Sequence, residues 1–203
     1  VTLFMAWISH HYDRRELAVT ALVGGFLAPF LVGTASPNFL FLYVYMAILN
    51  LGSLYLSWSN RWNELPLIST GATFLVLLIA MFGDFVDPYA LHVTFYGLFW
   101  LIATMSCFAF LRRGMTDIFT GLHIGAMILS SVLTIILVSS LREYGNYDSA
   151  VTALVMGLVY IALHLWLRQS EQRNGVTQSV LLALGLALLL ALVNLVYYCL
   201  LLY

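Results

Sequence analysis

The side chains best suited to chemistry in this sequence are a few histidines that lie inside long apolar runs. Histidine changes its charge near neutral pH, and an ionisable residue inside a membrane segment is a functional-site candidate by default. His123 lies about two helical turns into one such run. Thr120, Met127, Ser130 and Thr134 flank it at three- and four-residue steps, which places all five on one helix face. This polar face is a candidate path for a proton or a small solute. The alternative is a neutral His123 that bonds to a neighbouring helix.

Two other histidines have weaker patterns. His92 follows Asp84 and Asp87 in the spacing Asp-x-x-Asp-x-x-x-x-His, which offers oxygen and nitrogen ligands for a metal. Asp87 followed by proline is equally a helix cap, so we expect no metal site. His164 lies one turn before Arg168, which indicates a position at the membrane interface.

Two amides lie in the middle of apolar runs, Asn50 and Asn194. Such amides commonly bond across helices, each contributing about 0.6 kcal/mol, and substrate binding is the alternative. The sequence has no nucleotide-binding, zinc-protease or serine-hydrolase motif, and its breaks between apolar runs are short. We therefore predict no catalytic residue, no cofactor and no metal, and we expect that the chain is not an enzyme.

The composition places these residues in a membrane. Of the 203 residues, 63% are hydrophobic and 8% are charged, whereas soluble domains carry about 25% charged residues. This number of charged residues is too small to cover the surface of a soluble fold. The surplus of apolar side chains must therefore face lipid. The net charge of −1 gives no reason to expect a nucleic-acid partner. The expected partners are the lipid bilayer and either other membrane subunits or further copies of the chain.

The elements that position these residues are apolar runs of about 19 residues or longer, the length that crosses a bilayer as a helix. We predict an all-α polytopic transmembrane bundle of antiparallel hairpins, forming one membrane-embedded domain over residues 1–203. Residues 1–12 form a partial helix whose start is missing, so we expect the chain to be a fragment of a longer one. The predicted spans are 16–34, 38–58, 64–83, 88–111, 117–141, 149–168 and 178–203.

The arginines predict the orientation of these spans. All eight basic residues are arginines, and they concentrate in alternate breaks, with Arg142 as the exception. Because short basic loops resist translocation, the breaks that hold most of the arginines should be cytoplasmic. These arginines are Arg14, Arg15, Arg61, Arg112, Arg113, Arg168 and Arg173.

Small residues and one proline interrupt the apolar runs. Gly24 and Gly25 precede Pro29 in the first full span, and Gly121 and Gly125 lie beside His123. Glycines allow membrane helices to approach closely, and a proline bends a helix that a neighbour supports. We interpret these five residues as packing positions, with Pro29 as an alternative hinge.

Segment 14–80 combines a basic turn, a Gly-Gly-aromatic-Leu-x-Pro helix, a Leu-Asn pair and an Arg-Trp turn. The residues that form this pattern are Gly24, Gly25, Phe26, Leu27, Pro29, Leu49, Asn50, Arg61 and Trp62. In this pattern the segment resembles a family of multi-pass bacterial membrane proteins known as domain of unknown function 2339. The resemblance implies a location in the bacterial inner membrane and, because the family has no assigned activity, no catalytic residue.

Three hypotheses about function follow. The first is a multi-spanning structural or assembly module of the bacterial envelope, favoured by tight loops and sparse polar content. The second is a transporter or permease that moves a small solute or lipid along the Thr120–Thr134 face, with Asn50 and Asn194 as further polar positions. The third is a membrane-embedded enzyme whose active site lies in the missing part of the chain.

Overall fold

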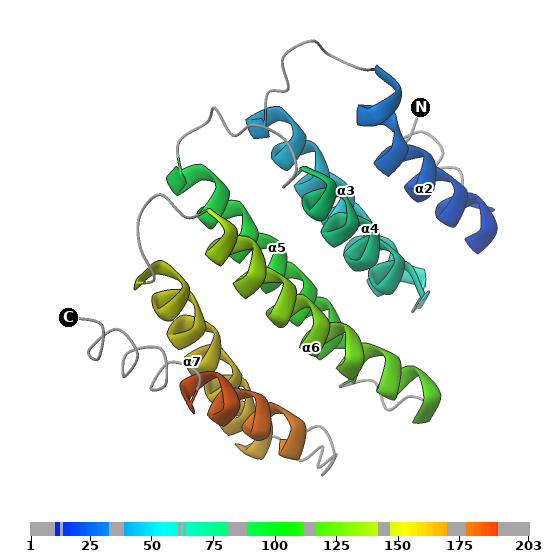
Figure 1. The fold of residues 1–203 in the computed structure, drawn as a ribbon. Coiled ribbons are helices and arrows are strands. Elements are labelled where there is room, and N and C mark those ends of the chain that lie inside the picture. Colours follow the sequence, from blue (N-terminus) through cyan, green and yellow to red (C-terminus); the bar gives the residue numbers. More distant parts are fainter. Residues whose placement is uncertain are drawn as a thin grey trace. The chain divides into compact units, whose positions relative to one another are not determined.

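The computed structural model describes residues 11–12, 14–32, 39–60, 62, 64–80, 89–111, 117–141, 147–169 and 178–190. Every regular element in these ranges is a helix, as Figure 1 shows. The labelled helices are α2 (Arg15–Val32), α3 (Phe39–Asn60), α4 (Glu64–Ala80), α5 (Tyr89–Leu111), α6 (Asp117–Ser140) and α7 (Tyr147–Gln169). One further helix spans Gln178–Leu190.

The helices begin where the apolar runs of the sequence begin, each within two residues of the expected start. The runs are long, and turn-forming or charged residues separate them, so each backbone can satisfy its own hydrogen bonds as a helix. The prediction of an all-α helical bundle is confirmed. The partial helix expected over 1–12 lies largely outside the described residues, as does the end of the last predicted span.

Four of the described helices are long and apolar enough to cross a membrane: Phe39–Ser59, Tyr89–Phe108, Thr120–Ser140 and Ala150–Arg168. Helix α4 has 17 residues, which gives a length of about 26 Å at 1.5 Å per residue. The hydrocarbon layer is about 30 Å thick, so α4 as described falls just short of it. The total of seven spans stays a prediction.

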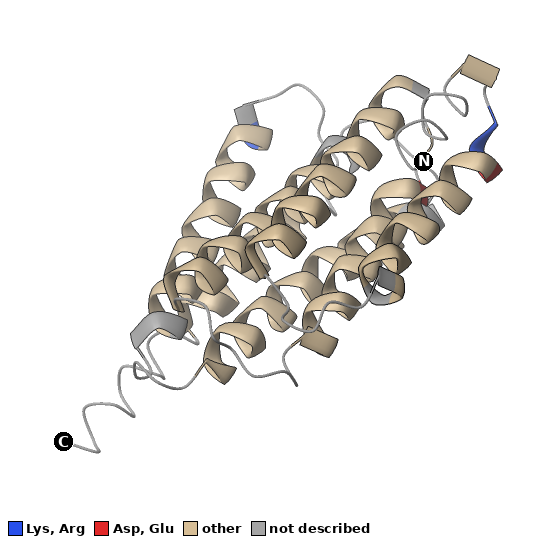
Figure 2. Ribbon diagram, turned by 90° about the horizontal axis from the view of Figure 1, so that it is seen from above, with Lys and Arg blue, Asp and Glu red and all other residues tan. Residues whose placement is uncertain are grey.

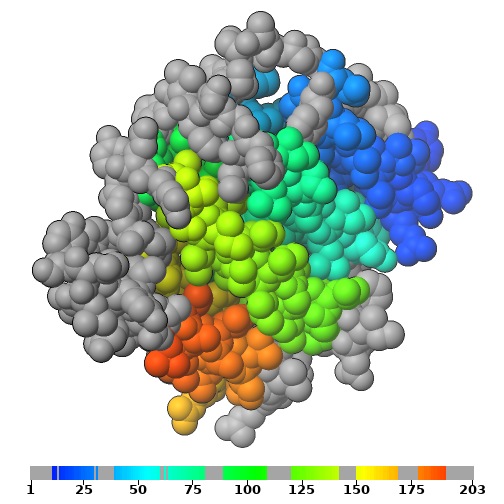
Figure 3. Space-filling model, in the orientation of Figure 1, coloured from blue at the N-terminus to red at the C-terminus, as the bar shows by residue number. Residues whose placement is uncertain are grey.

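The chain divides into two compact units, residues 1–110 and 111–203. In the first unit, α2, α3 and α4 pack against one another in all three pairings. In the space-filling view, the side chains of α4 lie directly beside those of α2 (Figure 3). Aromatic side chains join α5 to α3 in the same unit.

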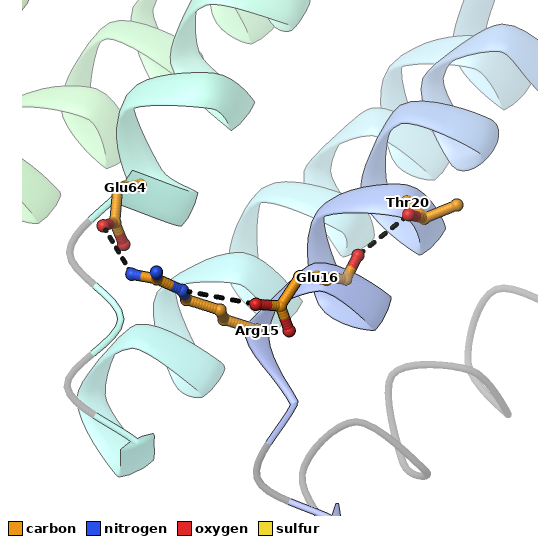
Figure 4. A network of polar contacts seen from close by, with 4 residues as sticks. All are labelled: Arg15, Glu16, Thr20 and Glu64. Carbon is orange, nitrogen blue, oxygen red and sulfur yellow. Dashed lines mark hydrogen bonds and ion pairs between the residues drawn. The ribbon is translucent and has the colours of Figure 1, made fainter.

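Successive helices of the first unit run in opposite directions. Arg15 at the start of α2 lies 3.6 Å from Glu64 at the start of α4, measured from Nη1 to Oε1 (Figure 4). Tyr43 near the start of α3 bonds to His92 near the start of α5. Helices α2 and α4 therefore begin at one end of the unit, and α3 and α5 begin at the other. This is the antiparallel hairpin arrangement that short loops favour.

The second unit contains α6, α7 and the Gln178–Leu190 helix. The hydroxyls of Ser131 on α6 and Tyr160 on α7 are 2.6 Å apart. A ring nitrogen of His164 on α7, Nδ1, lies 2.9 Å from the carbonyl oxygen of Gln178. These bonds fasten each helix of the unit to the next one in the chain.

The outer surface of the described helices is apolar. Leu31 and Phe41 are 83% and 73% exposed, which would be costly in water but suits contact with lipid tails. The charged residues that Figure 2 colours blue and red lie at the ends of helices. The distribution of polar and apolar surface is therefore that of helices in a bilayer.

Candidate functional site

The polar side chains of α3 reach three different neighbouring helices. Tyr45 bonds to α2, Asn50 bonds to α4, and Tyr43 bonds to α5. All four helices belong to the first compact unit. Because apolar burial gives little attraction between helices in lipid, such bonds are a main source of their specificity.

The first bond repairs the break that Pro29 makes in α2. Proline has no backbone N–H, so the carbonyl four residues earlier, that of Gly25, loses its ordinary helical donor. The hydroxyl of Tyr45 donates to this carbonyl oxygen over 2.9 Å. An unpaired carbonyl in a membrane costs free energy, so the neighbouring helix makes the proline tolerable.

The two adjacent glycines of α2 play different roles in the structure. Gly25 is buried and presents its carbonyl to Tyr45. Gly24 is exposed, and a Cβ added there would meet nothing within 4 Å. In the described residues, therefore, the contact with α3 involves Gly25 and no close approach depends on Gly24.

The second bond is part of an amide–hydroxyl cluster between α3 and α4. The Asn50 amide nitrogen donates to the Thr73 hydroxyl over 2.7 Å and to the Met46 carbonyl over 2.9 Å. The Ser69 hydroxyl donates to the Asn50 carbonyl oxygen over 2.6 Å. Thr73 in turn donates to the Ser69 carbonyl over 2.8 Å. Asn50 thus makes the cross-helix bonds expected of a mid-membrane amide.

The polar groups of this cluster have few donors left with which to bind a ligand. Both amide hydrogens of Asn50 and the hydroxyl hydrogens of Ser69 and Thr73 are engaged. All three residues are buried. Ser53 is a further buried residue of α3 and is not part of this cluster. Its hydroxyl has no hydrogen-bond partner among the described residues. The arrangement resembles a clamp between two helices more than an open binding site.

The third bond joins α3 to α5 inside an aromatic cluster. The Tyr43 hydroxyl lies 2.7 Å from His92 Nδ1 and 3.5 Å from the Tyr96 hydroxyl. The exposed fractions of Tyr43, His92 and Tyr96 are 0%, 1% and 0%. Phe95 and Phe99 lie against the Tyr43 ring, with ring centroids 5.1 Å and 6.2 Å from it. The imidazole of His92 is therefore buried in the interior of the unit, in contact with aromatic rings.

The metal hypothesis for His92 is not tested by the structure, because Asp84 and Asp87 lie outside the described residues. Within the described part of the chain, no three histidine, cysteine or acidic residues are grouped as metal ligands. The Nδ1 atom of His92 lies within hydrogen-bond distance of the Tyr43 hydroxyl.

The polar face predicted on α6 is buried in the structure. His123 and Thr134 are 0% exposed, Ser130 is 1% exposed, and Thr120 is partly exposed. The hydroxyls of Ser130 and Thr134 donate to carbonyls of their own helix, those of Met127 and Ser130. The face is therefore an interior face of α6, and its role as a path stays a prediction.

The glycines that lie close to a neighbouring helix are not the two glycines beside His123. Gly121 and Gly125 are exposed, and a Cβ at either would meet nothing within 4 Å. A Cβ at Gly157 on α7 would lie 3.3 Å from the Gly185 carbonyl oxygen, and one at Gly185 would lie 2.9 Å from Ile161 Cγ1. Close helix approach in the second unit occurs at Gly157 and Gly185. The remaining predicted residue, Asn194, lies outside the described residues.

The comparison with protein families agrees with this architecture. A family model described as "Predicted membrane protein (DUF2339)" matches residues 1–201. The chain belongs to this family. The resemblance seen in the sequence over 14–80 is thus confirmed and extends over almost the whole chain. No curated protein and no solved structure matches the chain.

Membership of the DUF2339 family makes the chain a predicted membrane protein and assigns it no activity. Several residues that build the site were not singled out in the sequence, notably Tyr43, Tyr45, Ser69, Thr73 and Tyr160. A signal existed for Tyr45, because Pro29 must leave the Gly25 carbonyl without its helical donor. Which neighbouring hydroxyl fills that position depends on helix packing and cannot be read from spacing.

Proposed function

We propose that this chain is a multi-spanning structural module of the bacterial inner membrane that holds membrane subunits, or copies of itself, in an assembly. The observation that carries the proposal is that α3 is hydrogen-bonded to three neighbouring helices. Its polar side chains Tyr43, Tyr45 and Asn50 each bond to a different helix of the same unit. Such bonds produce a rigid helical body, which is what a scaffold requires.

The chemistry of the buried groups supports this proposal over transport. A solute path needs polar groups that can exchange partners with the solute. The Asn50 cluster instead has its donor hydrogens engaged within α3 and α4. On α6, the Ser130 and Thr134 hydroxyls bond to their own helix. The described polar groups therefore mostly serve the fold.

The proposed orientation places the arginine-bearing breaks in the cytoplasm. The Arg15–Glu64 ion pair supports one step of this proposal, because it brings the starts of α2 and α4 to the same end of the unit. Arg14 and Arg15 lie at the start of α2, and Arg61 lies three residues before the start of α4. Basic residues at one end of the unit favour retention of that end on the cytoplasmic side.

Labelling of single cysteines in intact cells tests the orientation. In a background with Cys107→Ser and Cys199→Ser, Ser59→Cys lies near Arg61, whereas Ser36→Cys lies in the preceding break. An impermeant maleimide should label Ser36→Cys before cell lysis and Ser59→Cys only after lysis. The reverse pattern would invert the proposed topology, and both substitutions leave the arginines in place.

Native mass spectrometry of the chain in membrane-derived nanodiscs tests the assembly role. We expect the tagged chain to appear in complexes of fixed stoichiometry, either with defined subunits or with itself. The same sample dissociated in a harsh detergent gives the mass of the single chain as a reference. A monomer in the native nanodisc would contradict the proposal.

A second candidate function is a permease, and the burial of His123 favours it. The side chain of His123 is 0% exposed, and an ionisable residue inside a membrane helix is a candidate for a functional site. If this function is correct, His123→Ala should abolish a pH-dependent flux or growth phenotype without reducing expression. His11→Ala is the control, because His11 is exposed. Wild-type behaviour of His123→Ala would remove this candidate.

A further inference from the structure

We propose that Ser53 on α3 and Ser69 on α4 bind one water molecule between them. This water extends the Asn50 cluster by one helical turn, toward the end of the unit at which α2 and α4 begin. The site lies within the first compact unit, and it does not depend on the assembly role.

The hydroxyl of Ser53 is enclosed and has no hydrogen-bond partner among the described residues, and the residue is only 3% exposed. A serine in a helix can donate to a carbonyl of its own preceding turn, as Ser106 and Ser130 do over 2.7 Å and 2.9 Å. Ser53 does not make this bond. Because a buried polar group without a partner is costly in apolar surroundings, the Ser53 hydroxyl is a candidate to bind a polar molecule.

The bonds of Asn50 place Ser69 on the same side of the cluster as Ser53. Asn50 is bonded to both Ser69 and Thr73, which lie one turn apart on α4. Because α3 and α4 run in opposite directions, the turn of α3 that follows Asn50 and carries Ser53 lies nearer to Ser69 than to Thr73. The Ser53 hydroxyl does not bond to Ser69 directly, so only a molecule that lies between the two hydroxyls can connect them.

Small side chains from three helices lie at this level of the unit. Gly25 on α2 is bonded to Tyr45 on α3. Ala18 lies seven residues before Gly25, and Ser53 lies eight residues after Tyr45, so in antiparallel helices the two residues are level. Ala18, Ser53 and Ser69 are all buried, and their helices pack against one another in all three pairings. Three small side chains at a contact of three helices suit a molecule as small as water.

The hydrogen bonds already made define the chemistry of the bound molecule. Ser69 donates its hydrogen to Asn50 over 2.6 Å, so its oxygen can only accept from a molecule at this site. Ser53 has both its hydrogen and its lone pairs available. The molecule must therefore donate to Ser69 and either accept from Ser53 or donate to it. Water meets both requirements without bringing a charge into the membrane interior.

Water-edited solid-state NMR of the full chain in lipid bilayers tests the site on the unmodified protein. With ¹³C-serine, magnetisation that starts on water should reach the Cβ atoms of Ser53 and Ser69. Spectra of Ser53→Ala and Ser69→Ala assign these two signals. The control is Ser106, a buried serine bonded to its own helix, which should receive no transfer in the same mixing time. Transfer to Ser53 no greater than that to Ser106 would overturn the proposal.

A double-mutant cycle tests whether the two serines share the bound molecule. In unfolding titrations, Ser53→Ala should lower the ratio of folded to unfolded chain about threefold, the effect of an average cross-helix bond in a membrane. In a Ser69→Ala background the same substitution should leave the ratio unchanged, because the bridge is already broken. Ser106→Ala is the matched control and should have the same effect in both backgrounds.

Two results of this cycle contradict the proposal. A ratio that rises on Ser53→Ala would show that the hydroxyl has no partner of any kind in the folded chain. Equal effects of Ser53→Ala with and without Ser69 would show that no molecule connects the two side chains.

Discussion

The hydroxyl of Tyr45 donates a 2.9 Å hydrogen bond to the carbonyl oxygen of Gly25, the residue four positions before Pro29. Pro29 is the proline inside α2, so Gly25 is the position where that helix lacks an internal donor. A side chain from α3 thus replaces a missing backbone bond of α2. This relationship explains how a Gly-Gly-x-x-x-Pro sequence is stable within an apolar helix, and it makes the two helices depend on each other.

Removal of the Tyr45 hydroxyl should expose this dependence. Tyr45→Phe leaves the Gly25 carbonyl without its donor, and an unsatisfied buried group costs about 1 to 3 kcal/mol. In a Pro29→Ala background, residue 29 regains an N–H that can bond Gly25. There, Tyr45→Phe should cost only a few tenths of a kcal/mol. Unfolding titrations in mixed micelles measure all four members of this double-mutant cycle.

The control for this cycle is Tyr55→Phe, since Tyr55 is an exposed tyrosine on the same helix. It should cost less than about 0.5 kcal/mol. Equal losses for Tyr45→Phe with and without Pro29 would show that the bond does not replace the missing helical donor.

The Asn50 cluster should stabilise the α3–α4 pair modestly. Asn50→Leu removes the bonds to Ser69 and Thr73 but keeps a side chain of similar volume. Cross-helix bonds in membranes average about 0.6 kcal/mol and reach about 1.7 kcal/mol. We expect a loss in that range in the same unfolding titration. Gly52→Ala is the control on α3, because a Cβ there would meet nothing within 4 Å. A cost for Asn50→Leu no greater than for Gly52→Ala would show that the cluster is not a clamp.

The sequence predicted the helices well because their cause is local. A run of apolar residues must satisfy its backbone internally in lipid, and charged or turn-forming residues mark its ends. The starts of α4 and α6 at Glu64 and Asp117 coincide with the predicted starts. The bonding role of Asn50 also follows from local information, because a mid-membrane amide needs a partner.

The partners themselves were not predictable, because they depend on which helix faces meet. Gly121 and Gly125 have the spacing of a packing motif but face open space in the structure. Gly157 and Gly185 have no such spacing within either helix, yet they meet because α7 and the following helix are antiparallel. The His164–Gln178 bond fixes this register, with Gly157 seven residues before His164 and Gly185 seven residues after Gln178.

The Arg15–Glu64 ion pair should contribute little to stability. Its side chains are 64% and 41% exposed, and surface ion pairs are worth about 0 to 1 kcal/mol. Glu64→Gln should therefore lower the free energy of unfolding by less than about 0.5 kcal/mol, and added salt should remove the difference. Unfolding titrations at low and high salt measure this effect. A large loss that persists in high salt would mean that Glu64 has a further partner in the folded unit.

The contact of Gly157 with Gly185 should be the most sensitive helix contact of the second unit. At Gly185, an added Cβ would lie 2.9 Å from Ile161 Cγ1 and 3.3 Å from the Gly157 carbonyl oxygen. The side chain of Ile161 can move, but the backbone carbonyl can yield only if the helices separate. Gly185→Leu should therefore cost about 1 to 3 kcal/mol, as overpacking does in well-packed cores. Gly185→Ala should cost less, because one methyl group needs a smaller adjustment.

Gly121→Leu and Gly125→Leu are the matched controls, because a Cβ at either position would meet nothing within 4 Å. In the isolated chain both should leave stability unchanged or raise it slightly, since glycine disfavours a helix by about 1 kcal/mol relative to alanine. Thermal unfolding of the four variants in one detergent measures this order. If Gly125→Leu proved as harmful as Gly185→Leu in this measurement, leucine would be harmful even at a position with open space around it, and the loss at Gly185 could not be assigned to its contact with Gly157.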